Sequence, residues 1–171
     1  LYGNLVPEDP DGMKRALAAY ALIVEAAGAA LRKEPNLLVA RQALYTAHRA
    51  RGLQLHRAGR YREALQDWGK ALEVAADESQ RAPCLIARAA SLAALGDHAR
   101  AAAEARAVAG RGDLSEESLY NLACVYSVCL GAVLKDATLS PAERQQLGEQ
   151  YAAGALTLLR RVHAITLGLR S

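Results

Sequence analysis

The stretch RGLQLHRAGRYREALQDWGKAL, residues 51–72, decides the fold of this chain. Apolar side chains recur at helical spacing on both sides of Gly59, which predicts two helices joined by a glycine turn. Gly52 in the first helix and Ala64 in the second are small, so we expect the two backbones to touch there. Because the connection is short, the helices are predicted to be antiparallel neighbours.

The pattern of this helix pair returns further along the chain. The pattern is formed by small and apolar residues at fixed spacing: Gly52, Leu55, Gly59, Ala64, Trp68 and Ala71. The positions 37 residues later hold Ala89, Leu92, Gly96, Ala101, Ala105 and Val108. The first two positions of the pattern recur 34 residues after Ala89 and Leu92, as Ala123 and Tyr126. A repeat of this length is the signature of stacked helical units that bury a shared core.

Composition points to the same class of fold. The 171 residues include 38 Ala and 27 Leu but only 16 β-branched residues and no Phe. Ala and Leu favour helices, whereas strands are enriched in β-branched and aromatic residues. We therefore predict an all-α protein, an antiparallel helix-pair array of about seven helices. The helices are expected at residues 12–34, 37–58, 61–76, 79–95, 99–109, 113–135 and 141–168.

Two helix starts carry a capping signal. Ser140 is followed by Pro141 and, three residues after the serine, by Glu143, the order of a capping box with a first-turn proline. Asp113 and Glu116 have the same spacing at the start of the sixth helix.

Residues 51–72 closely resemble the tetratricopeptide repeat family. The next unit, RAASLAALGDHARAAAEARAV, fits less tightly because Ala105 stands where the family prefers an aromatic residue, and the unit opened by LYNLACVYSV is longer by about 20 residues. The resemblance implies an α-solenoid with a right-handed superhelix. It implies one domain over residues 12–171, after an extended leading segment at 1–11. Its units are expected at 38–76, 79–110 and 115–168, preceded by a lone helix at 12–34.

A narrower resemblance concerns the order of the motifs. EALQDWGKALEVA, LGDHARAAAEA, LYNLACVYS, SPAERQQLGEQYA and LLRRV follow one another as in the tetratricopeptide regions C-terminal to the catalytic domain of large bacterial serine/threonine protein kinases. The chain begins at Leu1 and its only methionine is Met13, so we expect it to belong to a longer protein. It contains no glycine-rich phosphate loop, no His-Arg-Asp and no Asp-Phe-Gly motif. The chain itself is therefore predicted not to be an enzyme and to need no cofactor.

Charge is unevenly distributed along the chain. The net charge is only +3, yet residues 41–62 hold six arginines and no acid, whereas residues 63–78 hold five acids and one lysine. One interpretation is internal pairing between the two neighbouring helices, mostly at the surface. The other is a basic binding surface.

The family resemblance places such a surface, because the first helix of each pair lines a concave groove that receives a peptide. The groove residues predicted in this way are Arg49, Leu53, His56, Arg57, Tyr120 and Asn121. Arg49 and Arg57 would bind carboxylates and Asn121 would bond the peptide backbone. The predicted function is protein–protein interaction with a protein or peptide of acidic character, as the non-catalytic region of a larger signalling protein.

The same residues are compatible with other functions. A stand-alone scaffold or a self-associating, homo-oligomeric adaptor is the main alternative. Nucleic-acid binding is a distant one, because the net charge is small and no aromatic residues alternate with the arginines. No metal site is expected, since His48 and His56 lie eight residues apart with no acid between them.

Cysteines and apolar runs bear on the compartment. Cys84, Cys124 and Cys129 form no disulfide framework and indicate a reducing, cytoplasmic environment. Residues 13–31 imitate a signal peptide, but Glu25 interrupts the run and its apolar part is shorter than the ~20 residues of a bilayer span. We therefore predict an amphipathic helix there and no membrane association.

Overall fold

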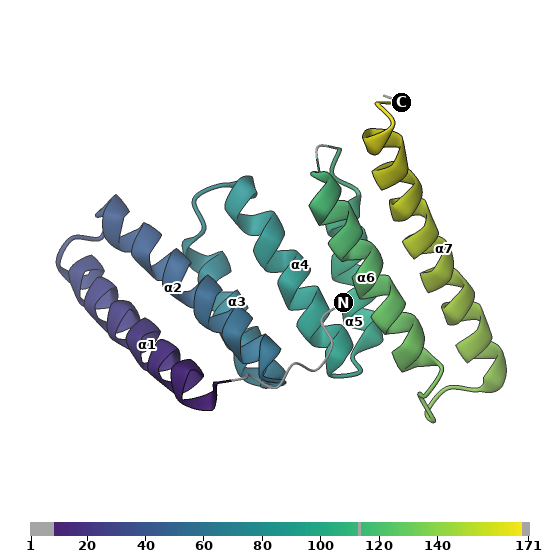
Figure 1. The fold of residues 1–171 in the computed structure, drawn as a ribbon, viewed down its shortest axis with the longest axis horizontal. Helices are drawn as coiled ribbons and strands as arrows, with labels where there is room; N and C mark the ends of the chain where they lie inside the picture. Colours follow the sequence, from purple (N-terminus) through teal and green to yellow (C-terminus); the bar gives the residue numbers. More distant parts are fainter. Residues whose placement is uncertain (1–8, 113, 169–171) are drawn as a thin grey trace. The chain divides into compact units, whose positions relative to one another are not determined.

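In a computed structural model, residues 9–112 and 114–168 are described, and they form helices and turns without a strand (Figure 1). The seven helices are α1 (Pro10–Lys33), α2 (Leu38–Arg57), α3 (Tyr61–Val74), α4 (Glu78–Ala94), α5 (His98–Ala109), α6 (Glu116–Val133) and α7 (Pro141–Thr166). The prediction of an all-α protein with seven helices is confirmed for this part of the chain. None of these helices combines the length and the apolar character that crossing a membrane requires.

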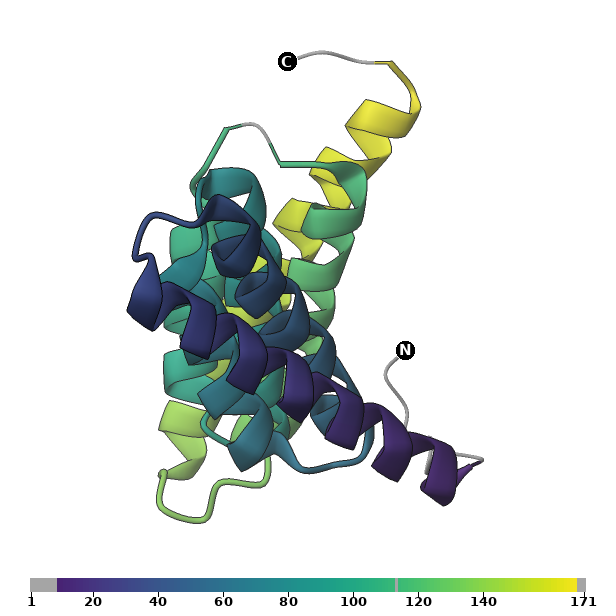
Figure 2. The same cartoon turned by 90° about the vertical axis from the view of Figure 1, so that its left-hand side faces the viewer.

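Contacts divide the chain into two compact units, Leu1–Arg88 and Ala89–Ser171. In the first unit α1 packs on α2 and α2 packs on α3, as Figures 1 and 2 show. The residues of α4 up to Arg88 complete this unit. Its core consists of Tyr45, Leu55, Ala64, Trp68, Ala71, Leu72 and Cys84.

The close approach of α2 and α3 is made at Gly52. A Cβ atom added to Gly52 would lie 3.2 Å from three atoms of the Trp68 ring. The indole of Trp68 thus lies directly over Gly52, and Ala64, the residue predicted to contact Gly52, is itself fully buried. The missing side chain at Gly52 makes room for the large side chain of Trp68.

Two turns repeat the same backbone geometry 37 residues apart. Gly59 has φ 73° after α2, and Gly96 has φ 86° after α4. In the first turn the amide of Arg60 donates to the carbonyl of Leu55 at 2.9 Å, and in the second Asp97 donates to Leu92 at 3.0 Å. This six-residue closure with a left-handed glycine is a Schellman motif, which satisfies carbonyls at the end of a helix.

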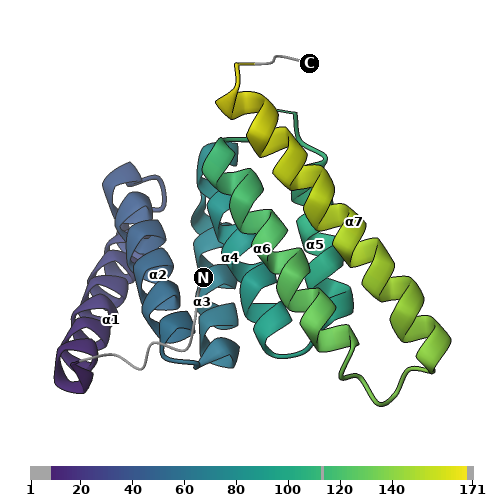
Figure 3. The same cartoon turned by 45° about the vertical axis from the view of Figure 1, so that its right-hand side comes forward.

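The second unit contains the rest of α4 and the helices α5, α6 and α7. α5 packs on α6, and α6 packs along α7 in an antiparallel pair (Figure 3). Gly154 of α7 lies against Tyr126 of α6, where an added Cβ atom would be 3.1 Å from the ring. The largest fully buried side chains of this unit are Leu92, Val108, Leu119, Leu122, Cys129 and Val133.

Of the two predicted helix caps, the one at α7 is present as predicted, and α6 is capped by a different residue. At α7 the capping box is present, because Ser140 Oγ accepts from the Glu143 amide at 3.3 Å and Glu143 Oε2 accepts from the Ser140 amide at 2.8 Å. At α6 the cap is Ser115, whose Oγ accepts from the Ser118 amide at 3.2 Å. The predicted cap Asp113 lies outside the described residues.

The N-terminal prediction falls partly on undescribed residues as well. Residues 1–8 of the predicted leading segment lie outside the described part. α1 begins at Pro10 instead of at residue 12, because the side chain of Asp9 accepts a hydrogen bond from the Gly12 amide at 2.8 Å and caps the helix.

Candidate functional site

A buried carboxylate joins α2 to α3. Asp67 on α3 is only 2% exposed, and its Oδ1 lies 2.7 Å from His48 Nδ1. Arg51 donates to the same carboxylate twice, from Nε to Oδ2 at 2.8 Å and from Nη2 to Oδ1 at 2.7 Å. This bidentate pairing fixes both the distance between the helices and their register.

The partners of Asp67 keep it ionised in spite of its burial. Burial alone would raise its pKa, but the hydrogen bonds from His48 and Arg51 outweigh that effect and hold the pKa of Asp67 below its ordinary value. The hydrogen bond to Asp67 likewise raises the pKa of Arg51. The cluster of His48, Arg51 and Asp67 is therefore a charged group, hydrogen-bonded within itself, that fastens α2 to α3.

The arginines of residues 41–62 divide into two groups. Arg51 is paired with Asp67, and Arg60 makes an exposed bidentate pair with Glu63, with N–O distances of 2.7 and 2.6 Å. The other four are exposed, and within the described residues none of them is in an ion pair. These four are Arg41, Arg49, Arg57 and Arg62. Internal pairing thus accounts for two of the six arginines, and the other four remain at the surface.

Arg49, Leu53 and Arg57 follow one another along a single face of α2. Both arginines are exposed, and Leu53 between them is half-buried and packs against the core of the first unit. Eight residues at 1.5 Å each separate the two arginines by about 12 Å along the helix. We call Arg49, Leu53 and Arg57 the α2 basic face.

His56 occupies a different environment from the other predicted groove residues. It is 9% exposed, and its ring meets the ring of Tyr61 edge-on, with centroids 5.1 Å apart. Burial, and then the charge of Arg57, lower the pKa of His56, so the neutral imidazole is favoured. The structure therefore places His56 beneath the α2 basic face rather than on it.

The N-terminal half of α2 is fixed against α4. Gln80 Nε2 donates to Gln42 Oε1 at 2.8 Å, and Tyr45 Oη donates to the carbonyl of Gln80 at 3.0 Å. Burial raises the pKa of Tyr45 to about 12, so its hydroxyl remains a neutral donor. These contacts hold α2 from a second side.

The remaining predicted residues lie on α6, in the second unit. Tyr120 is 46% exposed and Asn121 beside it is half-buried. A shallow hollow of about 400 Å³ is lined by Glu116, Glu117, Tyr120 and Val162. The structure thus brings Tyr120 together with two acids and a valine of α7, and Asn121 does not line this hollow.

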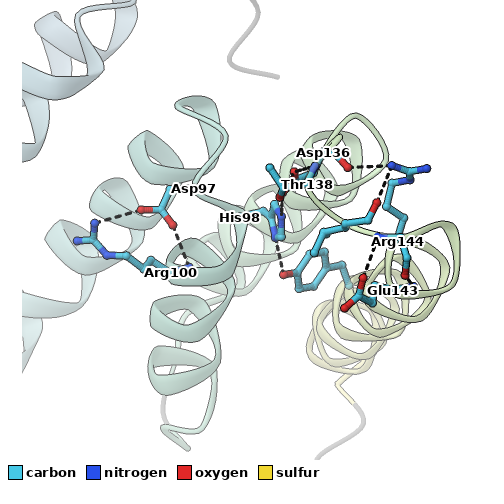
Figure 4. Close-up of polar contacts among 10 residues, drawn as sticks. Asp97, His98, Arg100, Asp136, Thr138, Glu143 and Arg144 are labelled. Carbon is cyan, nitrogen blue, oxygen red and sulfur yellow. Dashed lines mark hydrogen bonds and ion pairs between the residues drawn. The ribbon is translucent and has the colours of Figure 1, made fainter.

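Sequence reasoning missed a polar network in the second unit (Figure 4). His98, the first residue of α5, is 7% exposed. Its Nδ1 lies 2.9 Å from Tyr151 Oη, and its Nε2 lies 3.1 Å from Asp136 Oδ2. Because the carboxylate only accepts, Nε2 donates to Asp136, and the Tyr151 hydroxyl donates a hydrogen bond to Nδ1. The network ties α5 to α7 and to the connection that precedes α7.

The same connection is held by further hydrogen bonds. Asp136 Oδ1 accepts from the amide and the hydroxyl of Thr138, at 2.9 and 2.6 Å. These bonds, and then the one from His98, lower the pKa of Asp136. Arg144 donates to the carbonyls of Asp136 and Leu139, both at 2.9 Å. Because these bonds hold the connection to α5 and to α7, the network is a structural element.

Comparison of the chain with protein-family models, with curated proteins and with solved structures finds no match. Among the described residues, no group of three or more His, Cys, Asp or Glu could hold a metal ion. All three cysteines are free thiols. The candidate site is therefore defined by its own geometry, and the α2 basic face is its best-formed part.

Proposed function

We propose that this chain is a protein-interaction module of the tetratricopeptide type that binds an acidic peptide segment on the α2 basic face. The observation that carries the proposal is the contrast among neighbouring arginines. Arg51 and Arg60 are held in ion pairs, whereas Arg49 and Arg57 are exposed and, within the described residues, unpaired. An arginine with five free donors on a rigid helix is suited to carboxylate recognition.

The spacing of the face suggests the form of the ligand. Two carboxylates about 12 Å apart correspond to residues seven or eight positions apart in a helix, or about four apart in an extended strand. Leu53 lies midway and presents apolar surface to a side chain between the two acids. The expected ligand is therefore a segment with two acids flanking an apolar residue.

The rigidity of the support favours specific binding. The Asp67 cluster fixes α2 on α3, and the Gln42 and Tyr45 hydrogen bonds fix it on α4. A binding side chain on a held helix loses less conformational entropy when a ligand arrives. Tyr120 and Asn121 remain a proposed second contact surface, on the second unit.

The wider role is proposed from the sequence. We propose that the module is the non-catalytic region of a larger signalling protein, such as a bacterial serine/threonine kinase, and that it acts in the cytoplasm. The order of the repeat motifs supports the first statement, and the three free cysteines support the second.

A charge-reversal experiment tests the α2 basic face. The variant Arg49→Glu with Arg57→Glu is compared with Arg41→Glu with Arg62→Glu, which changes the net charge equally at two other exposed arginines. The probe is a fluorescein-labelled peptide rich in glutamate with a central leucine, followed by fluorescence anisotropy. We expect the first variant to bind at least about tenfold more weakly and the second to bind nearly as well as the unaltered protein.

Two results would contradict the proposal. Equal loss in both double variants would show that only net charge matters. Tighter binding of a DNA duplex than of the peptide, lost in the same variant, would favour nucleic-acid recognition instead. Circular dichroism of each variant checks that the helices remain intact.

A further inference from the structure

The outward face of α7 carries apolar side chains that the second unit leaves uncovered. Leu156 is 54% exposed and Leu159 is 41% exposed, and Ala153 beside them is exposed as well. The buried residues of α7 lie on the side of the helix where α6 packs, turned by about 120° from Leu156 and about 180° from Ala153, and Leu159 lies at the edge of that side. These buried residues are Gly148, Tyr151, Ala155 and Leu158. An apolar stripe of this kind on an end helix is typical of an interaction surface.

Two opposite charges frame the stripe. Glu149 lies seven residues, about two helical turns, before Leu156, and Arg160 lies four residues after Leu156. Glu149 and Arg160 are therefore 11 residues apart. At 100° per residue the two side chains differ in direction by only about 20°, and they are about 16.5 Å apart along the axis. Glu149 accepts a hydrogen bond from Gln145 at 3.0 Å, but among the described residues neither it nor Arg160 is in an ion pair.

We propose that this face binds a second copy of the chain, with the two α7 helices antiparallel about a two-fold axis. The midpoint between Glu149 and Arg160 is also the midpoint between Ala153 and Leu156, since 149 and 160 have the same sum as 153 and 156. One rotation therefore sets each Glu149 opposite Arg160 of the second copy and each Leu156 opposite Ala153 of the second copy. Such self-complementarity is what an isologous interface requires.

The outer face of α1 is the competing surface, and its charges fit less well. Leu22 is 68% exposed and Ile23 is 44% exposed. However, Arg15 already pairs with Asp9 at 3.3 Å, so this arginine is engaged within its own helix. The observations therefore favour α7, and α1 supplies the control.

The expected dimer is a weak one. A single pair of helices in contact from Glu149 to Arg160 buries less surface than the roughly 1,200–2,000 Å² of a standard interface. We therefore expect a monomer–dimer equilibrium that depends on concentration. This proposal concerns a different helix from the α2 basic face and does not rest on the peptide-binding function.

Sedimentation velocity of the chain, at roughly 5–200 µM, tests the surface. We expect the weight-average mass to rise toward a dimer, Leu156→Lys to abolish the rise, and the matched control Leu22→Lys to leave it unchanged. A chain that stays monomeric at every concentration overturns the proposal. So does a dimer that Leu22→Lys dissociates and Leu156→Lys does not, or a mass that grows past the dimer, which indicates an open, head-to-tail contact.

A charge exchange tests the antiparallel arrangement. Glu149→Arg alone and Arg160→Glu alone should each weaken the dimer at least about tenfold, because two repulsive pairs form. Mixing the two single variants should restore dimers, since Arg then faces Glu at both positions of the heterodimer. The double variant should also dimerise like the unaltered chain. If neither the mixture nor the double variant recovers, the antiparallel α7 pairing is wrong.

Discussion

Replacing Asp67 by asparagine tests whether the buried cluster holds α2 in place. Asparagine has the same shape but only one oxygen acceptor, and its amide nitrogen must take the place of Oδ1 or of Oδ2. In the first position it faces two donors, Arg51 Nη2 and His48 Nδ1, and in the second it faces Arg51 Nε. At least one charge-assisted hydrogen bond is lost in either case.

The size of the effect follows from that loss. A hydrogen bond to a charged group contributes about 1.5–3 kcal/mol, and leaving a donor unpaired in a buried site adds to the cost. The Arg51 side chain is 28% exposed, so water compensates part of it. We expect Asp67→Asn to lower the free energy of unfolding by about 2–3 kcal/mol, and the melting temperature by roughly 4–12 °C in a chain of this length.

The assay uses the only tryptophan of the chain as its reporter. Trp68 lies next to Asp67 in the core of the first unit, so its emission during urea unfolding reports on this unit. The matched control is Glu63→Gln on the same helix, which removes a similar but exposed carboxylate pair. We expect the control to unfold at nearly the urea concentration of the unaltered chain. An Asp67→Asn variant that unfolds with the control would refute the structural role of the cluster.

The pH dependence has a definite sign. Because the folded-state pKa of Asp67 lies below the unfolded-state value of about 3.9, its stabilisation is present above that value and is lost as the pH falls through the folded-state pKa. The difference between the unaltered chain and Asp67→Asn should therefore be full at pH 6–7 and shrink below about pH 4. A difference that stays constant down to pH 3 would contradict this account.

Three further perturbations test other parts of the fold. Gly59→Ala should lower the free energy of unfolding by about 1–2 kcal/mol, because alanine resists a positive φ. Gly131→Ala, at an exposed position within α6, should raise it by about 0.5–1 kcal/mol. Thermal unfolding measures both effects, and equal melting temperatures of the two variants would be inconsistent with the turn geometry. Tyr151→Phe removes the donor to His98 Nδ1 and should cost about 1–2 kcal/mol in urea unfolding, and no measurable change would show that the bond is dispensable. Cys84 and Cys129 are fully buried, and burial raises the pKa of Cys129 to about 12. An aromatic disulfide reagent at pH 8 should therefore modify only Cys124 rapidly, and the other two thiols should react after unfolding. Equal reaction rates of the three thiols would contradict the burial.

Local signals in the sequence predicted the elements of the fold well. The capping box at Ser140 and the glycines that end α2 and α4 act within a few residues of their own position, so their effect can be predicted from neighbours alone. The start of α4 differs from the prediction by one residue: the helix begins at Glu78 instead of at residue 79, and the side chain of Asp77 accepts from the Gln80 amide at 3.1 Å. Sequence signals place a helix end only to within one or two residues.

Long-range polar contacts could not be predicted in the same way. His98 meets Tyr151 and Asp136 across 53 and 38 residues, and no periodic mark connects them. Asp67 looked like one of several surface acids, although its position on the buried side of α3 was available from the helical period. Among the predicted groove residues, a shared helical stripe did not guarantee exposure. His56 shares the stripe of Arg49 and Leu53 in sequence, but Tyr61 covers its ring in the structure.

The matching turns at Gly59 and Gly96 have a consequence for how such a chain changes length by recombination. Joining Gly59 directly to Asp97 would remove 37 residues and lead from α2 into α5 through a turn of nearly the same φ. Glu104 stands 37 residues after Asp67, so an acid would again follow at the helical position that faces Arg51. Ala105 would replace Trp68 and leave the space beside Gly52 unfilled. In such a shortened chain, a large side chain at position 105 would be needed to fill the space beside Gly52 again.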